Sequence, residues 1–248
     1  MVATPSTNAT TSAPMNPARA RWRTAAILEL VAPRTSTTPP PSTPPTPTRA
    51  KPRSRAAVIA AGFSGDVERA RAALSSPQAE LRSAGLGALE RCGALTVAQL
   101  CVAMEDHDPS VRRRAMELGA TVRGRGTKTT LITAAMQRLS DPEPLVVDAV
   151  CWLLGEHRAR AAVLALIDVS ANHDDARCRE AAVAALGAIG DPGGLDAILA
   201  RLEDRPQIRR RVVVALSSFS GPRVDAALER CAVDHDWQVR QAVELLGR

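Results

Sequence analysis

The chain has 248 residues, 45% of them apolar, and a formal net charge of +6. This length accommodates one or two globular domains. The longest strongly apolar run, AAVLALI at 161–167, is far shorter than the ~18 residues that a membrane-spanning helix needs. Aromatic residues are scarce, with no Tyr, two Phe and three Trp. The core must therefore be aliphatic, which favours packed helices over sheets.

The excess of basic over acidic groups is confined to residues 1–55. Residues 1–55 carry seven Arg and one Lys against a single acid, Glu29, whereas residues 56–248 carry 24 basic and 25 acidic groups. The second region lacks the basic excess that is typical of a nucleic-acid-binding domain.

The five cysteines are odd in number and form no CxxC pair. Zinc sites and disulfide frameworks need clustered or paired spacings. We interpret the cysteines as buried thiols in a reducing compartment, and we expect a cytoplasmic protein. The 30 Arg against two Lys indicate a GC-rich genome, as in many bacteria.

Residues 1–55 form a Pro/Thr/Ser-rich basic segment. Its tract TSTTPPPSTPPTPT at 35–48 buries no apolar area, so we predict a disordered tail. One short helix is predicted at 17–31, with Asn16 as its cap. A weak tail helix, a segment that docks on a partner or membrane surface, a targeting leader and an upstream start before Met15 all remain open.

From residue 56 onward the sequence repeats with a period of 30–34 residues. Each copy predicts two helices, and the second begins at an Asp that Pro often follows. Several second helices are expected to end near Leu-Gly, at 118–119, 154–155, 186–187 and 246–247. The copies align on LR at 81–82, VR at 111–112, LV at 145–146, CR at 178–179, IR at 208–209 and VR at 239–240. The pattern predicts an all-α fold, an α-solenoid of about six stacked antiparallel helix pairs over 56–248, with an extra pair near 55–74.

Three segments carry a resemblance to a known family: DDARCREAAVAALGAIGDPGGLDAILARLED at 174–204, DPSVRRRAMELG at 108–119 and DHDWQVRQAVELLG at 234–247. They resemble HEAT repeats of the short bacterial kind, which also occurs in phycobilisome lyase-type proteins. The resemblance covers about residues 76–248.

The resemblance also implies a structural ladder of Asp and Arg side chains between neighbouring repeats. The expected pairs are Asp106 or Asp108 with Arg112, Asp175 with Arg179, and Asp236 with Arg240. Val146 stands where the third copy would carry its Arg, so an interruption is expected there.

The second helices of such repeats line a concave face, which gives candidate binding residues. They are Arg113, Glu117, Asp148, Glu180, Arg210 and Gln241. Trp152 lies seven residues after Leu145 and is interpreted as a packing residue. Trp237 occupies the position of a Pro in sister copies and is expected to cap its turn.

His107, His173 and His235 all fall in the turn before a second helix. Helices in a stack lie about 10 Å apart, so no two of these imidazoles reach one metal ion at ~2.1 Å. No nucleophile motif or phosphate-binding loop is present. We therefore expect no catalytic residue, no metal site and no cofactor.

The function expected from these patterns is a non-enzymatic protein–protein interaction scaffold or adaptor that uses its concave face. The alternatives are nucleic-acid binding, as in HEAT-like DNA glycosylases, and bilin lyase-like chaperone activity. The expected partners are another protein, nucleic acid only weakly through the basic tail, and a second copy of the chain through the C-terminal repeat.

Overall fold

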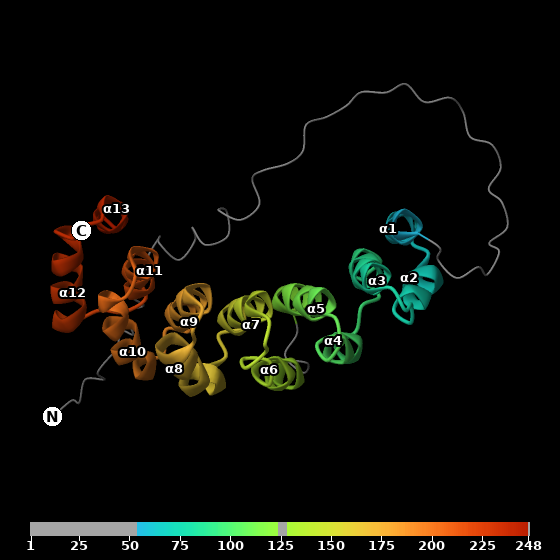
Figure 1. The fold of residues 1–248 in the computed structure, drawn as a ribbon, viewed down its shortest axis with the longest axis horizontal. Coiled ribbons are helices and arrows are strands. Elements are labelled where there is room, and N and C mark those ends of the chain that lie inside the picture. Colours follow the sequence, from blue (N-terminus) through green and yellow to red (C-terminus); the bar gives the residue numbers. More distant parts are fainter. Residues whose placement is uncertain (1–53, 124–127, 248) are drawn as a thin grey trace, which may run out of the picture. The chain divides into compact units, whose positions relative to one another are not determined.

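The computed structural model describes residues 54–123 and 128–247, in which every regular element is a helix (Figure 1). The chain divides into two units, residues 1–45 and 46–248, and all described residues lie in the second. The helix predicted at 17–31 lies outside the described residues. The division into a tail and a repeat domain stays a prediction.

The odd-numbered helices pack side by side in one continuous row, each against the next. From α3 onward they correspond to the second helices of the predicted pairs, and the row forms the inner side of the curve of this unit (Figure 1). The row consists of α1 (Arg55–Ser64), α3 (Ala79–Arg91), α5 (Pro109–Thr121), α7 (Pro144–Glu156), α9 (Ala176–Ile189), α11 (Pro206–Leu216) and α13 (Trp237–Leu245).

The even-numbered helices form an outer layer, and each packs against the odd-numbered helix that follows it. They are α2 (Val67–Ala73), α4 (Val97–Ala103), α6 (Lys128–Met136), α8 (Val163–Asn172), α10 (Leu195–Ala200) and α12 (Pro222–Ala232), with short 3₁₀ turns at 160–162, 192–194 and 201–203. The predicted α-solenoid is confirmed. Two helices lie near 55–74 as expected, but α2 packs as the outer partner of α3, and α1 is an additional inner helix.

Three inner helices, α5, α9 and α13, begin at an Asp as the sequence indicates, whereas α7 begins at Glu143 and α11 at Arg205. Asp108 Oδ1 accepts a hydrogen bond from the Ser110 N–H at 2.9 Å, and Asp175 and Asp236 cap α9 and α13 in the same way. These carboxylates satisfy backbone donors that the first helical turn leaves without a partner. Trp237 is the first residue of α13, the position that Pro109 holds in α5, but the side chain that caps α13 belongs to Asp236.

The three interior helices end within two residues of Leu-Gly, as predicted, but the glycine is not the residue that ends them. Helices α5, α7 and α9 continue beyond Gly119, Gly155 and Gly187. A Cβ on Gly187 would lie 2.7 Å from the Cα of Ala215 in α11. This glycine therefore permits close packing against the next helix instead of ending its own.

The core is aliphatic, as the composition predicts. One continuous cluster of buried Leu, Val, Ile, Ala and Met side chains runs from Leu86 to Val243, and a smaller cluster joins α1, α2 and α3. Cys151, Cys178 and Cys231 are buried free thiols, and burial raises the pKa of Cys178 to about 12. Because buried apolar surface contributes roughly 25 cal/mol per Å², these two clusters supply most of the free energy that stabilises the fold.

Candidate functional site

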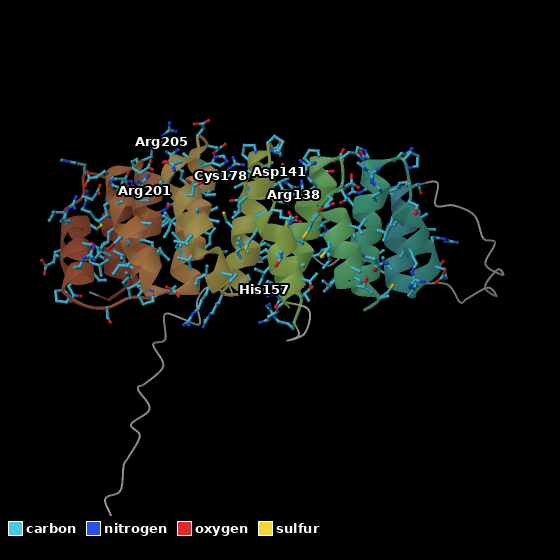
Figure 2. All side chains as sticks on the ribbon, turned by 90° about the horizontal axis from the view of Figure 1, so that it is seen from below. Arg138, Asp141, His157, Cys178, Arg201 and Arg205 are labelled. Carbon is cyan, nitrogen blue, oxygen red and sulfur yellow. The ribbon has the colours of Figure 1, made fainter. Side chains whose placement is uncertain are left out.

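Four arginines join successive repeats along one edge of the stack. In each pair the Nε and Nη2 atoms donate to the two oxygens of one carboxylate at 2.7–2.9 Å. The pairs are Arg82–Asp106, Arg112–Asp141, Arg179–Asp204 and Arg209–Asp234. Figure 2 shows Asp141, Cys178 and Arg205 along this edge and His157 at the opposite one.

Each ladder arginine also fixes its own turn through the third nitrogen. In Arg112, Nη1 donates to the carbonyl oxygens of Asp106 and His107 at 2.9 and 3.1 Å. Hydrogen bonds from the Arg179 and Arg209 guanidinium groups lower the pKa values of Asp204 and Asp234. Asp204 and Asp234 therefore stay charged to lower pH than free carboxylates do.

The ladder pairing differs from the expected one by a full repeat. The carboxylate partner of Arg112 is Asp141, not Asp106 or Asp108, and that of Arg179 is Asp204, not Asp175. Asp108, Asp175 and Asp236 cap helices instead. An arginine four residues into a helix points toward the following repeat, where the next turn supplies the acid.

The ladder is interrupted between α7 and α9, and the register differs from the expected one by one residue. Counting from the helix caps, Val147 and not Val146 stands at the arginine position of α7. The facing turn carries His173 in place of an Asp, and its Nδ1 accepts a hydrogen bond from the Asp175 N–H at 3.1 Å. At the junction between α7 and α9, the ladder arginine and its acid are thus both replaced by other residues.

The same double replacement occurs at the first junction of the described stack. Val58 stands at the arginine position of α1, and Ser76 stands in the facing turn, where its Oγ accepts from the Gln78 N–H at 3.2 Å. A buried charge without a partner costs several kcal/mol. Once a junction has lost either the arginine or the acid, replacing the remaining charged residue by an uncharged one therefore stabilises the chain.

The six predicted binding residues do not form one cluster. Arg113, Glu117 and Asp148 line a common groove between α5 and α7. Glu180 pairs with Arg211 at 2.9 Å. Arg210 donates to Gln238 at 3.3 Å, and Gln241 is exposed on α13.

The groove between α5 and α7 has a volume of about 510 Å³. Its floor and walls combine apolar and charged side chains: Glu90, Arg113, Arg114, Glu117, Leu118, Thr121, Leu145, Asp148, Ala149 and Trp152. Trp152 is 47% exposed, so its interpretation as a packing residue is wrong. Trp152 stands nine residues after the cap of α7, as Glu117 does after the cap of α5. Because the equivalent residue in α5 is charged, this position lies at the surface.

Asp148 lies beside Trp152 in the groove as a partly buried carboxylate. Desolvation raises its pKa, and Glu180 adds to this rise, while Arg177, Arg211 and Arg113 oppose it. No hydrogen bond or ion pair to Asp148 occurs within residues 54–123 and 128–247. Its oxygens are therefore free to accept donors from a bound molecule.

Comparison with known proteins agrees with this architecture. The family model for HEAT repeats matches residues 132–211, which span most of α6 through the middle of α11. This part of the chain consists of HEAT repeats. No curated protein sequence matches the chain significantly.

Solved structures with a similar fold include two designed armadillo repeat proteins and one bacterial protein. One design has 15% identity and a TM-score of 0.52, and covers 73% of this chain and 97% of its own. A second, made for modular peptide recognition, has 17% identity, the same coverage and a TM-score of 0.51. YibA from Escherichia coli has 12% identity and a TM-score of 0.54, and covers 81% of this chain and 76% of its own. At these identities the likeness concerns the fold alone.

His107, His173 and His235 lie in turns before inner helices, as predicted. His107 and His235 are exposed, and His173 takes the place of a ladder acid. Within the described part of the chain, no three His, Cys, Asp or Glu side chains are grouped so that they could hold a metal ion. None of the described helices is long and apolar enough to cross a membrane.

Proposed function

We propose that the chain is a protein-interaction scaffold that holds an extended segment of a partner protein in the groove between α5 and α7. The observation that supports this proposal is the pairing of a half-exposed Trp152 with a partly buried carboxylate, Asp148, that has no partner of its own.

Each of these two side chains offers a different kind of contact. Trp152 and Leu145 present an apolar surface, and exposed Trp residues are among those that contribute most to binding. Asp148 is already partly desolvated, so a backbone N–H or a basic side chain from the partner gains a hydrogen bond at a reduced desolvation cost.

The charge of the groove favours protein over nucleic acid. Glu90, Glu117 and Asp148 outnumber Arg113 and Arg114 among its lining residues. Phosphate backbones need an excess of basic groups, which this surface lacks. A designed protein of the same fold serves modular peptide recognition, which supports the proposal by analogy only.

The proposal is tested by affinity purification from the cells that make the protein, after nuclease treatment. The baits are the unaltered chain, Trp152→Ala, Asp148→Asn and the control Leu164→Ala, which removes an 81% exposed apolar side chain from the outer helix α8. We expect a protein that is recovered with the unaltered chain and the control and is reduced at least about tenfold with Trp152→Ala. Equal recovery with all four baits would overturn the proposal.

The homodimer predicted through the C-terminal repeat is a separate proposal. It concerns α13, which lies outside the groove.

A further inference from the structure

One strip of each inner helix faces the next helix of the row, at positions four, eight and twelve residues after the cap. At position four, the arginines reach the acid of the following repeat. At position eight, a Cβ on Gly62 would lie 2.9 Å from the Cα of Ala88 in α3. At position twelve, Gly187 approaches Ala215 of α11 in the same way.

In α13 this strip carries two charged residues, Arg240 and Glu244. At position eight the other inner helices have glycine or a buried apolar residue: Gly62, Leu86, Met116, Cys151, Val183 and Val213. Glu244 is exposed, and no described helix covers it. The outer strip of α13 is therefore not an ordinary aliphatic seam.

Arg240 is oriented as the ladder arginines are, but no carboxylate of residues 54–123 and 128–247 pairs with it. Its Nη1 donates to the carbonyl oxygens of Asp234 and His235 at 2.7 and 3.1 Å. Its Nε and Nη2 have no acceptor among the described residues, whereas in the four ladder pairs both atoms donate to a carboxylate at 2.7–2.9 Å. The Arg240 guanidinium is thus held in place by Nη1, while Nε and Nη2 remain available to donate to a carboxylate.

We propose that α13 packs antiparallel against α13 of a second copy of this chain, with Arg240 of each copy donating to Glu244 of the other. A twofold axis reverses the order of residues along the helix, so a cation and an anion four residues apart on one strip are self-complementary. The two side chains form no ion pair with each other inside α13, which leaves both available.

Trp237, three residues before Arg240, lies on the side of α13 that carries this strip, whereas Leu245 has the register of Trp152 in α7 and lies on another side of the helix. Trp237 is 59% exposed and Leu245 is 70% exposed, and both lie on α13. Trp237 supplies apolar area at the contact, which an interface of two ion pairs needs because surface ion pairs alone contribute little. The contact deepens the proposed scaffold function by naming a partner, but it leaves the groove between α5 and α7 free.

The test is sedimentation equilibrium of the full chain over the micromolar range, where weak symmetric contacts dissociate. The variants are Arg240→Glu, Glu244→Arg, the double exchange, and the control Glu229→Arg on an exposed position of α12. The unaltered chain and the control should dimerise equally. Each single reversal should weaken the dimer at least about tenfold, and the double exchange should restore it to within about threefold.

Three results would overturn the proposal: a monomer throughout the concentration range, a dimer that neither single reversal weakens, or a double exchange as weak as the weaker single variant. Because Arg240 also fixes two backbone carbonyls, Glu244→Arg is the decisive single variant, with helicity checked by circular dichroism. A negative result here leaves the Trp152 groove and its own experiment unaffected.

Discussion

Replacement of Asp141 by Ser tests whether the ladder charges depend on each other. The Arg112–Asp141 pair is the most buried of the ladder, with side chains 10% and 1% exposed. Ser keeps the turn, since Ser76 already accepts the equivalent backbone hydrogen bond at the first junction. It leaves Arg112 Nε and Nη2 buried without an acceptor, at a cost of about 3–5 kcal/mol.

The double variant Arg112→Val, Asp141→Ser recreates the uncharged junction found at Val58 and Ser76. It loses the two hydrogen bonds from Arg112 Nη1 to backbone carbonyls, each contributing about 0.5–1.5 kcal/mol, but it leaves no buried charge. We therefore expect it to be about 1–3 kcal/mol less stable than the unaltered chain, and more stable than Asp141→Ser alone.

Urea unfolding followed by circular dichroism at 222 nm measures these differences. The control is Asp196→Ser, which breaks the Arg223–Asp196 pair at 2.6 Å with side chains 65% and 79% exposed. It should cost less than about 1 kcal/mol, since exposed pairs contribute little. The reasoning is refuted if the two single effects at Arg112 and Asp141 simply add in the double variant, or if Asp196→Ser costs as much as Asp141→Ser.

Three further predictions follow from the packing and the charges. Gly187→Ala should destabilise the chain by about 1–3 kcal/mol in urea unfolding because its Cβ meets the α11 backbone. Gly87→Ala should be neutral or slightly stabilising, because its Cβ meets only the ends of two flexible side chains, Arg114 at 3.1 Å and Arg91 at 3.6 Å, and equal effects of the two substitutions would contradict this. The pKa of Asp234 is lower in the folded than in the unfolded chain, so its stabilisation is complete above about pH 4 and is lost as the pH falls through the folded value. Asp234→Asn should cost about 1–3 kcal/mol at pH 7 and make the acid limb of a stability–pH curve less steep, and an unchanged limb would argue against the pairing. The pKa of Asp148 is raised, so its charge opposes folding at neutral pH, and Asp148→Asn should raise the thermal midpoint at pH 7 while weakening partner recovery; a lowered midpoint would show that the carboxylate has a structural partner.

The repeat units were predictable because cap, anchor and apolar stripe recur together. Asp108 with Pro109 starts a helix by local chemistry alone, and Val111 with Ala115 defines its buried side at helical spacing. Such features depend on residues close in sequence.

The partner of each ladder arginine was not predictable in this way. Asp106 and Asp141 lie in equivalent turns on either side of Arg112, and the sequence gives no direction for the side chain. Only the packing of α5 on α7 shows that the guanidinium reaches forward to Asp141.

The groove was predicted in part. Arg113, Glu117 and Asp148 were recognised from their register on the inner helices, but Trp152 was assigned to the core because it falls seven residues after Leu145. Leu145 itself is only partly buried and lines the groove, so the stripe that joins Leu145 and Trp152 faces the groove and not the core. Comparison of Trp152 with Glu117, the equivalent residue in α5, correctly assigns Trp152 to the surface.

The claim that the inner groove binds a protein is tested most directly by photo-cross-linking in the cells that make the chain. A photoreactive phenylalanine analogue replaces Glu117, which lines the groove, or Leu164, which lies on the outer helix α8. The account predicts a discrete, protease-sensitive and nuclease-resistant adduct from position 117 that is absent from position 164. Adducts of equal yield from both positions, or an adduct from position 117 that nuclease removes, would contradict it.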